Sequence, residues 1–98
     1  MSLSLKTPQE ISLEIASRLK DRRLAQNLTQ AGLAARAGMS MPSLKRFEKT
    51  GEIAFVSLLK IALVLDCLDE CEALFAIRPK PASLFGEAPK IRKRGSIK

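Results

Sequence analysis

Residues 28–48 read LTQAGLAARAGMSMPSLKRFE and carry the start and stop signals of two short helices joined by a tight turn. The hydroxyl of Thr29 can accept a hydrogen bond from a free backbone N–H of a first helical turn, as N-cap residues do. Gly38 stands where a helix ends in a left-handed residue. Ser40 offers a second N-cap, and Pro42 then falls in a first turn, where its missing N–H costs little. The pattern predicts one helix after Thr29 and another after Ser40.

The second of these helices is predicted to have two unlike faces. At about 100° per residue, one arc roughly 100° wide collects a proline and three cations. They are Pro42, Lys45, Arg46 and Lys49. Leu44, Phe47 and Glu48 point away from this arc. A short helix with a basic outer face and an apolar inner face, standing against another short helix, is typical of a helix-turn-helix.

The segment resembles the helix-turn-helix of Cro and the phage repressors, also called the XRE family. It matches the run T-Q-x-x-L-A-x-x-x-G-x-S-x-x-[ST]-[LI]-x-x-[FI]-E, followed closely by Gly51, and residues 10–75 fit the five-helix domain of that family. The resemblance implies an all-α fold, a compact five-helix bundle of the Cro/repressor type. An extended basic C-terminal tail is predicted to follow this bundle.

The flanking sequence supplies signals for the other three helices. Thr7-Pro8-Gln9-Glu10 reads as a capping box, and the helix that it opens carries Ile11, Ile15 and Leu19 on one stripe. A fourth helix is predicted from about residue 55 to 65, and a short fifth from about 68 to 75. We therefore divide the chain into an N-terminal arm (1–6), a helix-turn-helix DNA-binding domain (7–76) and an extended or disordered arm with a basic tail (77–98).

The positive charge of the chain is concentrated at its end. Of the formal +7, residues 90–98 carry +5 and no acid, which leaves +2 for residues 1–89. The five cations are Lys90, Arg92, Lys93, Arg94 and Lys98. Such a tail favours contact with a nucleic-acid backbone. A disordered end that only aids solubility is the alternative.

Composition argues against several other classes of function. The chain has no His, which removes the commonest general base and the commonest metal ligand. Cys67 and Cys71 alone cannot complete a tetrahedral zinc site, and we expect them to pack as small hydrophobes. We therefore expect no enzyme, no cofactor and no metal. Short hydrophobic runs and the lack of a signal peptide lead us to expect a cytoplasmic protein that does not enter a membrane.

The resemblance also implies which residues meet DNA. Base contacts fall to Met41, Pro42, Lys45 and Arg46. Arg46 is the best candidate for direct readout, because a guanidinium can pair with O6 and N7 of guanine. Met41 and Pro42 depart from the Gln, Arg or Ser common in the family, and offer only apolar contacts. Backbone contacts are expected from Thr29, Gln30, Ser40, Ser43 and Lys49, with a weaker electrostatic contribution from Arg22 or Lys20. Arg23 and Glu48 occupy positions that form a partly buried ion pair in the family, which implies a structural role.

Three functions remain open at this stage. The first is a transcriptional repressor that binds double-stranded operator DNA as a homodimer. The second is an antitoxin-type regulator that binds and restrains a HipA-like toxin partner while regulating its own operon. The third is a helix-turn-helix used only for protein or RNA contact. A dimer surface is expected on the fifth helix and the arm after it, at Leu74, Phe75, Ile77, Leu84 and Phe85.

Overall fold

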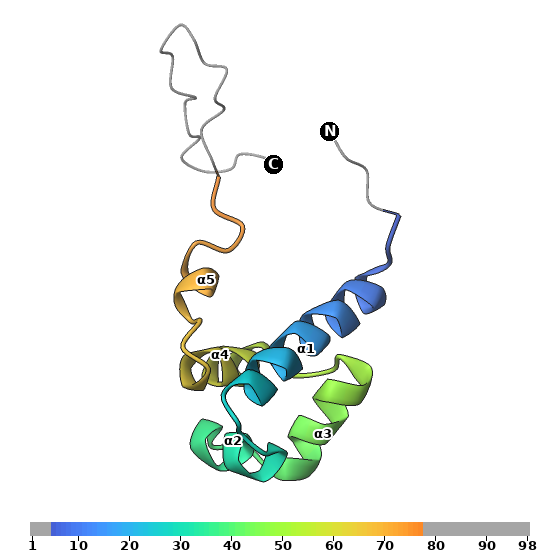
Figure 1. Ribbon diagram of the computed structural model, residues 1–98. Coiled ribbons are helices and arrows are strands. Elements are labelled where there is room, and N and C mark those ends of the chain that lie inside the picture. Colours follow the sequence, from blue (N-terminus) through green and yellow to red (C-terminus); the bar gives the residue numbers. More distant parts are fainter. Residues whose placement is uncertain (1–4, 78–98) are drawn as a thin grey trace, which may run out of the picture.

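Five helices account for most of the residues that the structure describes. The computed structural model describes residues 5–77 of the 98. The helices are α1 (Pro8–Ala25), α2 (Gln30–Ala37), α3 (Met41–Thr50), α4 (Phe55–Val64) and α5 (Asp69–Glu72) (Figure 1). α3 packs against both α1 and α2, and α2 packs against α4. The all-α, five-helix fold is thereby confirmed, while the basic tail and Leu84 and Phe85 lie outside the described residues.

The helix starts lie where the sequence signals place them. The hydroxyl of Thr7 accepts from the Glu10 N–H at 3.1 Å, and the Glu10 carboxylate accepts from the Thr7 N–H at 2.9 Å, which completes the capping box. The hydroxyl of Thr29 accepts from the Gly32 N–H at 2.9 Å. The hydroxyl of Ser40 accepts from the Ser43 N–H at 3.2 Å. Each cap satisfies a backbone donor that a helix start otherwise leaves open.

Two glycines end the helices of the motif in the left-handed region. Gly38 closes α2 at φ 69°, and Gly51 closes α3 at φ 82°. Gly51 has a second constraint, because a Cβ there would lie 2.9 Å from the carbonyl carbon of Ser12 in α1. No heavy atom lies within 4 Å of the corresponding position at Gly38. The end of α3 therefore sits directly on the backbone of α1.

A small apolar core holds α3 in place. Its largest fully buried side chains are Phe47, Leu33, Leu44, Ile61 and Leu65. They come from α2, α3, α4 and the residue that ends α4. Their burial removes the inner face of α3 from water, which is the main stabilising contribution to its position.

The apolar stripe predicted for α1 is present, but its first half is not buried. Ile11 and Ile15 remain 40 % and 36 % exposed, and the buried residues of α1 are Ala16 and Arg23. Leu19 alone of the stripe is packed against the core. Ile15 borders a hollow with Phe47 and Leu58, and Figure 1 shows the start of α1 extending beyond α3 and α4.

The fifth helix is shorter than the expected span of 68 to 75. α5 ends at Glu72, and its N-cap position has no side-chain cap. Phe75, which the expected span included, lies outside the helix with φ 65° and is 92 % exposed. α5 is a single turn that packs against the core through Cys71, and a helix of this length is marginal in water by itself.

Candidate nucleic-acid interface

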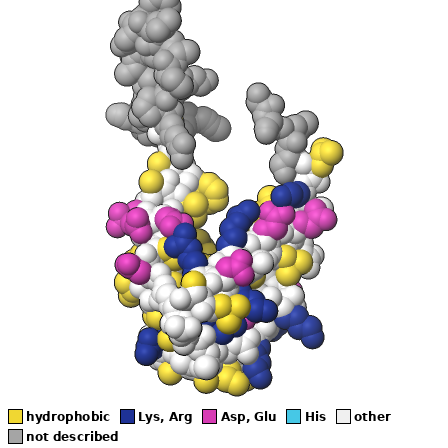
Figure 2. All heavy atoms as spheres, in the orientation of Figure 1, with side chains coloured by type: hydrophobic (Ala, Val, Ile, Leu, Met, Phe, Trp, Pro, Cys, Tyr) yellow, Lys and Arg dark blue, Asp and Glu magenta, His cyan; other side chains and the backbone are white. Residues whose placement is uncertain are grey.

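The outer face of α3 carries exposed cations, and its inner face lies in the core. Lys45, Arg46 and Lys49 are exposed, as is Pro42 in the first turn. Leu44 and Phe47 are 1 % and 2 % exposed. Figure 2 shows Lys and Arg side chains in both the upper part of the molecule and the lower part, where α2 and α3 lie, whereas most visible acids are in the upper part. The structure thus brings the predicted cations together on one side of the motif.

Two serines organise the first turn of α3. The Ser40 hydroxyl donates to the Ser43 Oγ at 2.8 Å while accepting from the Ser43 N–H. Both side chains are exposed, and Met41 beside them is 37 % exposed. In this arrangement the Ser43 hydroxyl hydrogen is left for an outside acceptor, which a phosphate oxygen can provide.

A buried ion pair joins α1 to α3. Arg23 Nε donates to Glu48 Oε2 at 2.9 Å and Arg23 Nη2 donates to Glu48 Oε1 at 3.1 Å. The two side chains are only 7 % and 6 % exposed. Arg23 Nη1 donates to the carbonyl oxygen of Leu28 at 2.8 Å. Because the charges are paired bidentately and their hydrogen bonds are made, their mutual attraction offsets the cost of removing them from water.

Gln30 extends this network to the first residue of α2. Its Nε2 donates to Glu48 Oε1 at 2.9 Å, so the amide is oriented by the carboxylate that pairs with Arg23. One hydrogen of Nε2 makes this bond, and the second is left for another acceptor. The predicted phosphate-binding side chain is therefore positioned by the structural ion pair, and the start of α2 is tied to α3 through it.

Comparison of the sequence with known protein families agrees with this geometry. A family model described as helix-turn-helix (HTH_3) matches residues 19–70, which is more than half of the chain. The chain belongs to this helix-turn-helix family. The match runs from the second half of α1 into α5 and contains both helices of the motif. No curated protein matches the sequence.

Membership of the helix-turn-helix family fixes the general activity. The protein is a DNA-binding transcription regulator of the Cro/repressor type. In such folds the second motif helix, here α3, is the recognition helix, and the first, here α2, crosses the DNA backbone. Within residues 5–77, no helix has both the length and the apolar character needed to cross a membrane.

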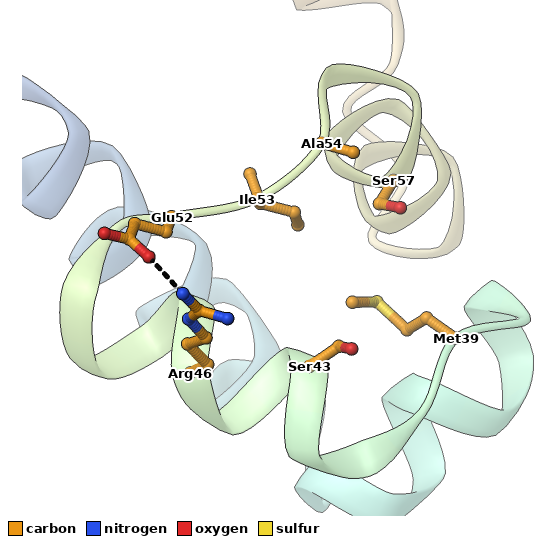
Figure 3. A pocket seen from close by; sticks show the side chains of 7 residues that line it. All are labelled: Met39, Ser43, Arg46, Glu52, Ile53, Ala54 and Ser57. Carbon is orange, nitrogen blue, oxygen red and sulfur yellow. Dashed lines mark hydrogen bonds and ion pairs between the residues drawn. The ribbon is translucent and has the colours of Figure 1, made fainter.

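Sequence reasoning missed one residue beside the recognition helix of this helix-turn-helix regulator. Glu52 Oε1 accepts from Arg46 Nη2 at 2.7 Å, and both side chains line a shallow hollow with Ser43 and Met39 (Figure 3). Helical periodicity does not predict this contact, because Glu52 follows the helix-ending Gly51.

Cys67 lies in the turn before α5 and Cys71 in α5 itself, and both line a groove beside α1. Cys67 is 4 % exposed and Cys71 is partly buried, as expected of small apolar residues. Burial raises the pKa of the Cys67 thiol, and the nearby Arg22 guanidinium acts in the opposite direction. Arg22 itself pairs with Glu70 at 2.8 Å, which directs it toward α5. In the described part of the chain, no three His, Cys, Asp or Glu side chains gather as a metal site.

The burial of Cys67 predicts unequal reactivity of the two thiols. At pH 8, a disulfide reagent such as DTNB should modify Cys71 several times faster than Cys67, because the thiolate is the nucleophile and burial disfavours it. The rates are measured on Cys67→Ser and Cys71→Ser, each of which leaves one thiol. Equal rates in native buffer would contradict the prediction, whereas equal rates in urea are expected.

Proposed function

We propose that this helix-turn-helix regulator is a repressor that binds operator DNA as a homodimer, with α3 in the major groove. The observation that supports this most directly is the division of α3 into a buried anchor and an exposed basic face. An anchored helix presents its outer side chains in a fixed register, which base readout requires.

The proposed roles of the exposed residues follow from their chemistry and position. Arg46 reads guanine and Lys45 contacts a neighbouring base or phosphate, while Met41 and Pro42 pack against thymine methyl groups. Thr29 and Ser40 bring the N-termini of α2 and α3 toward the phosphates, where free N–H groups attract anions. Backbone contacts are completed by Gln30, Ser43 and Lys49, and on our proposal by the tail cations after residue 89.

A homodimer gives two half-sites and hence sufficient affinity and specificity. One short helix reads only a few base pairs, and dimeric regulators place two such helices about one DNA turn apart. Exposed apolar residues at the end of the described chain offer a surface for this contact. Leu74, Phe75 and Ile77 are 44 %, 92 % and 77 % exposed. We propose that the domain spans residues 7–76 and that this surface pairs across the dimer axis.

The repressor proposal predicts a selective effect of Arg46→Ala. This change should weaken binding to the DNA upstream of the protein's own gene by about 1–3 kcal/mol, because a bidentate base contact is lost. Binding to a scrambled duplex should change much less. Fluorescence anisotropy at several salt concentrations measures both affinities.

Arg18→Ala is the matched control, because Arg18 is an exposed arginine on α1, paired with Glu14 at 3.5 Å. Arg18→Ala removes one positive charge, as Arg46→Ala does, but from a helix other than α3. Equal losses on both duplexes in Arg46→Ala would contradict direct readout. An unchanged affinity, together with abolished binding on deletion of residues 90–98, would favour the use of the motif for protein or RNA contact alone.

A second candidate is an antitoxin-type regulator that also restrains a HipA-like toxin. It is favoured by a mainly apolar groove between α1, α4 and α5, whose lining includes Ile15, Leu19, Leu58 and Leu74. Such a groove can receive a segment of another protein. The protein is co-expressed with the product of its neighbouring gene, and the molar mass of the purified material is measured by light scattering. A mass above that of the homodimer is expected only for the antitoxin-type regulator. A homodimer that never gains mass in this mixture would contradict the antitoxin function.

A further inference from the structure

A carboxylate lies on the face that the proposed function turns toward DNA. Glu52 follows the residue that ends α3, and its Oε1 lies 2.7 Å from Arg46 Nη2. The side chains are 58 % and 69 % exposed, so water reaches both. An acid placed here repels the phosphates of approaching DNA. Its position beside Arg46, the best candidate for base readout, therefore calls for an explanation.

The position of Glu52 is fixed by the end of α3. The Glu52 N–H donates to Thr50 Oγ1 at 3.1 Å, and the Thr50 hydroxyl donates to the Arg46 carbonyl oxygen at 2.7 Å. The side-chain contact between Arg46 and Glu52 closes this ring of interactions, as Figure 3 shows for the pair itself. Thr50 therefore couples the backbone of Arg46 to the backbone of Glu52.

The contact orients Arg46 without engaging all of its donors. It joins one nitrogen to one oxygen, whereas the buried Arg23 uses Nε and Nη2 on both oxygens of Glu48. Among the described residues, Nε and Nη1 of Arg46 have no hydrogen-bond partner. A single exposed contact of this kind is weak and opens readily. The guanidinium is thus held in one direction and still has donors for a base edge.

We propose that Glu52 is a positioning residue that raises the sequence discrimination of Arg46. This inference rests on the proposed DNA-binding function. On a non-cognate duplex, Arg46 gains most by turning to a phosphate, and that movement gives up Glu52 and brings the phosphate near its carboxylate. On the cognate site, the oriented guanidinium meets its base with less rearrangement. Glu52 therefore penalises phosphate binding more than base binding.

The test is Glu52→Gln, which keeps the size of the side chain and removes its charge. Affinity for a scrambled duplex should rise about 1.5- to fivefold, the range expected of an exposed charge pair. Affinity for the upstream DNA should rise less, so the ratio of the two affinities falls. The salt slope on the scrambled duplex should steepen by up to about 0.9, because Arg46 then contacts a phosphate in a larger share of the complexes. A role in folding alone would change neither the ratio nor the slope.

Two controls isolate the pair. Glu72→Gln removes an equal charge from an exposed residue of α5 and should leave the affinity ratio unchanged. In an Arg46→Ala background, Glu52→Gln should have no further effect on the ratio, because the residue through which it acts is gone. If Glu52→Gln shifts the affinity ratio equally in the Arg46→Ala background, the proposal is overturned. The effect would then come from electrostatic repulsion between the carboxylate and the DNA.

The outcomes distinguish this inference from the function on which it rests. A protein that prefers its upstream DNA, with a ratio unchanged in Glu52→Gln, would overturn the role of Glu52 alone. Equal affinities of the unaltered protein for both duplexes would overturn the proposed function and the inference with it. Circular dichroism of each variant at the assay temperature verifies that it is folded.

Discussion

Glu48→Ala should lower the free energy of unfolding by about 3–5 kcal/mol, because it leaves the charge of Arg23 buried and unpaired. Arg23 loses both of its contacts to the carboxylate, and Gln30 loses the acceptor that orients its amide. The loss is a large fraction of the total stability of a small domain. Urea denaturation followed by circular dichroism at 222 nm measures it.

Two further variants show whether burial of the charge is responsible. The double change Arg23→Met with Glu48→Met should recover much of the lost stability, because an apolar pair of similar volume needs no charge partner. Arg18→Met breaks the exposed pair with Glu14, 69 % and 36 % exposed, and should cost at most about 0.5 kcal/mol. A loss in Glu48→Ala no larger than that of Arg18→Met would show that the pair contributes little.

Gly51→Ala should destabilise the protein by about 3 kcal/mol, through two effects that act at the same atom. Its φ of 82° is strained for any residue with a side chain. Its new methyl group would also lie 2.9 Å from the carbonyl carbon and the Cβ of Ser12, so that α3 must move away from α1. The change in the midpoint of urea denaturation measures the cost.

Gly38→Ala is the control for backbone strain alone. Gly38 has φ 69°, and a methyl group there meets open space. It should cost about 1 kcal/mol, which is the penalty for a left-handed alanine. If both substitutions cost the same, the close approach of α3 to α1 does not limit Gly51.

The parts of the fold set by neighbouring residues could be predicted from the sequence. The caps at Thr7, Thr29 and Ser40 and the left-handed ends at Gly38 and Gly51 each depend on a few adjacent residues, and all five are found. The same holds for the two faces of α3, because its alternation of apolar and charged residues follows the helical period.

The parts set by distant or missing partners could not be predicted. Periodicity marks Ile11 and Ile15 as one stripe, but their burial depends on which side chains of other helices lie opposite, and the packing leaves both residues exposed. The extent of α5 depends in the same way on an apolar partner for Phe75. In the candidate site, the pair of Arg46 with Glu52 crosses the end of a helix, where no repeat relates the two positions. The bond from Gln30 to Glu48 joins two helices and depends on their packing.

The division of α3 into two faces separates what the protein recognises from what keeps it folded. Leu44, Phe47 and Glu48 hold the helix, and none of them lies on the exposed arc with Lys45 and Arg46. If the proposed base contacts hold, substitutions on that arc alter DNA preference at almost no cost in stability, since they touch neither the core nor the buried charges. By evolution or by design, the same fold can therefore acquire new target sequences through substitution of a few exposed side chains of α3.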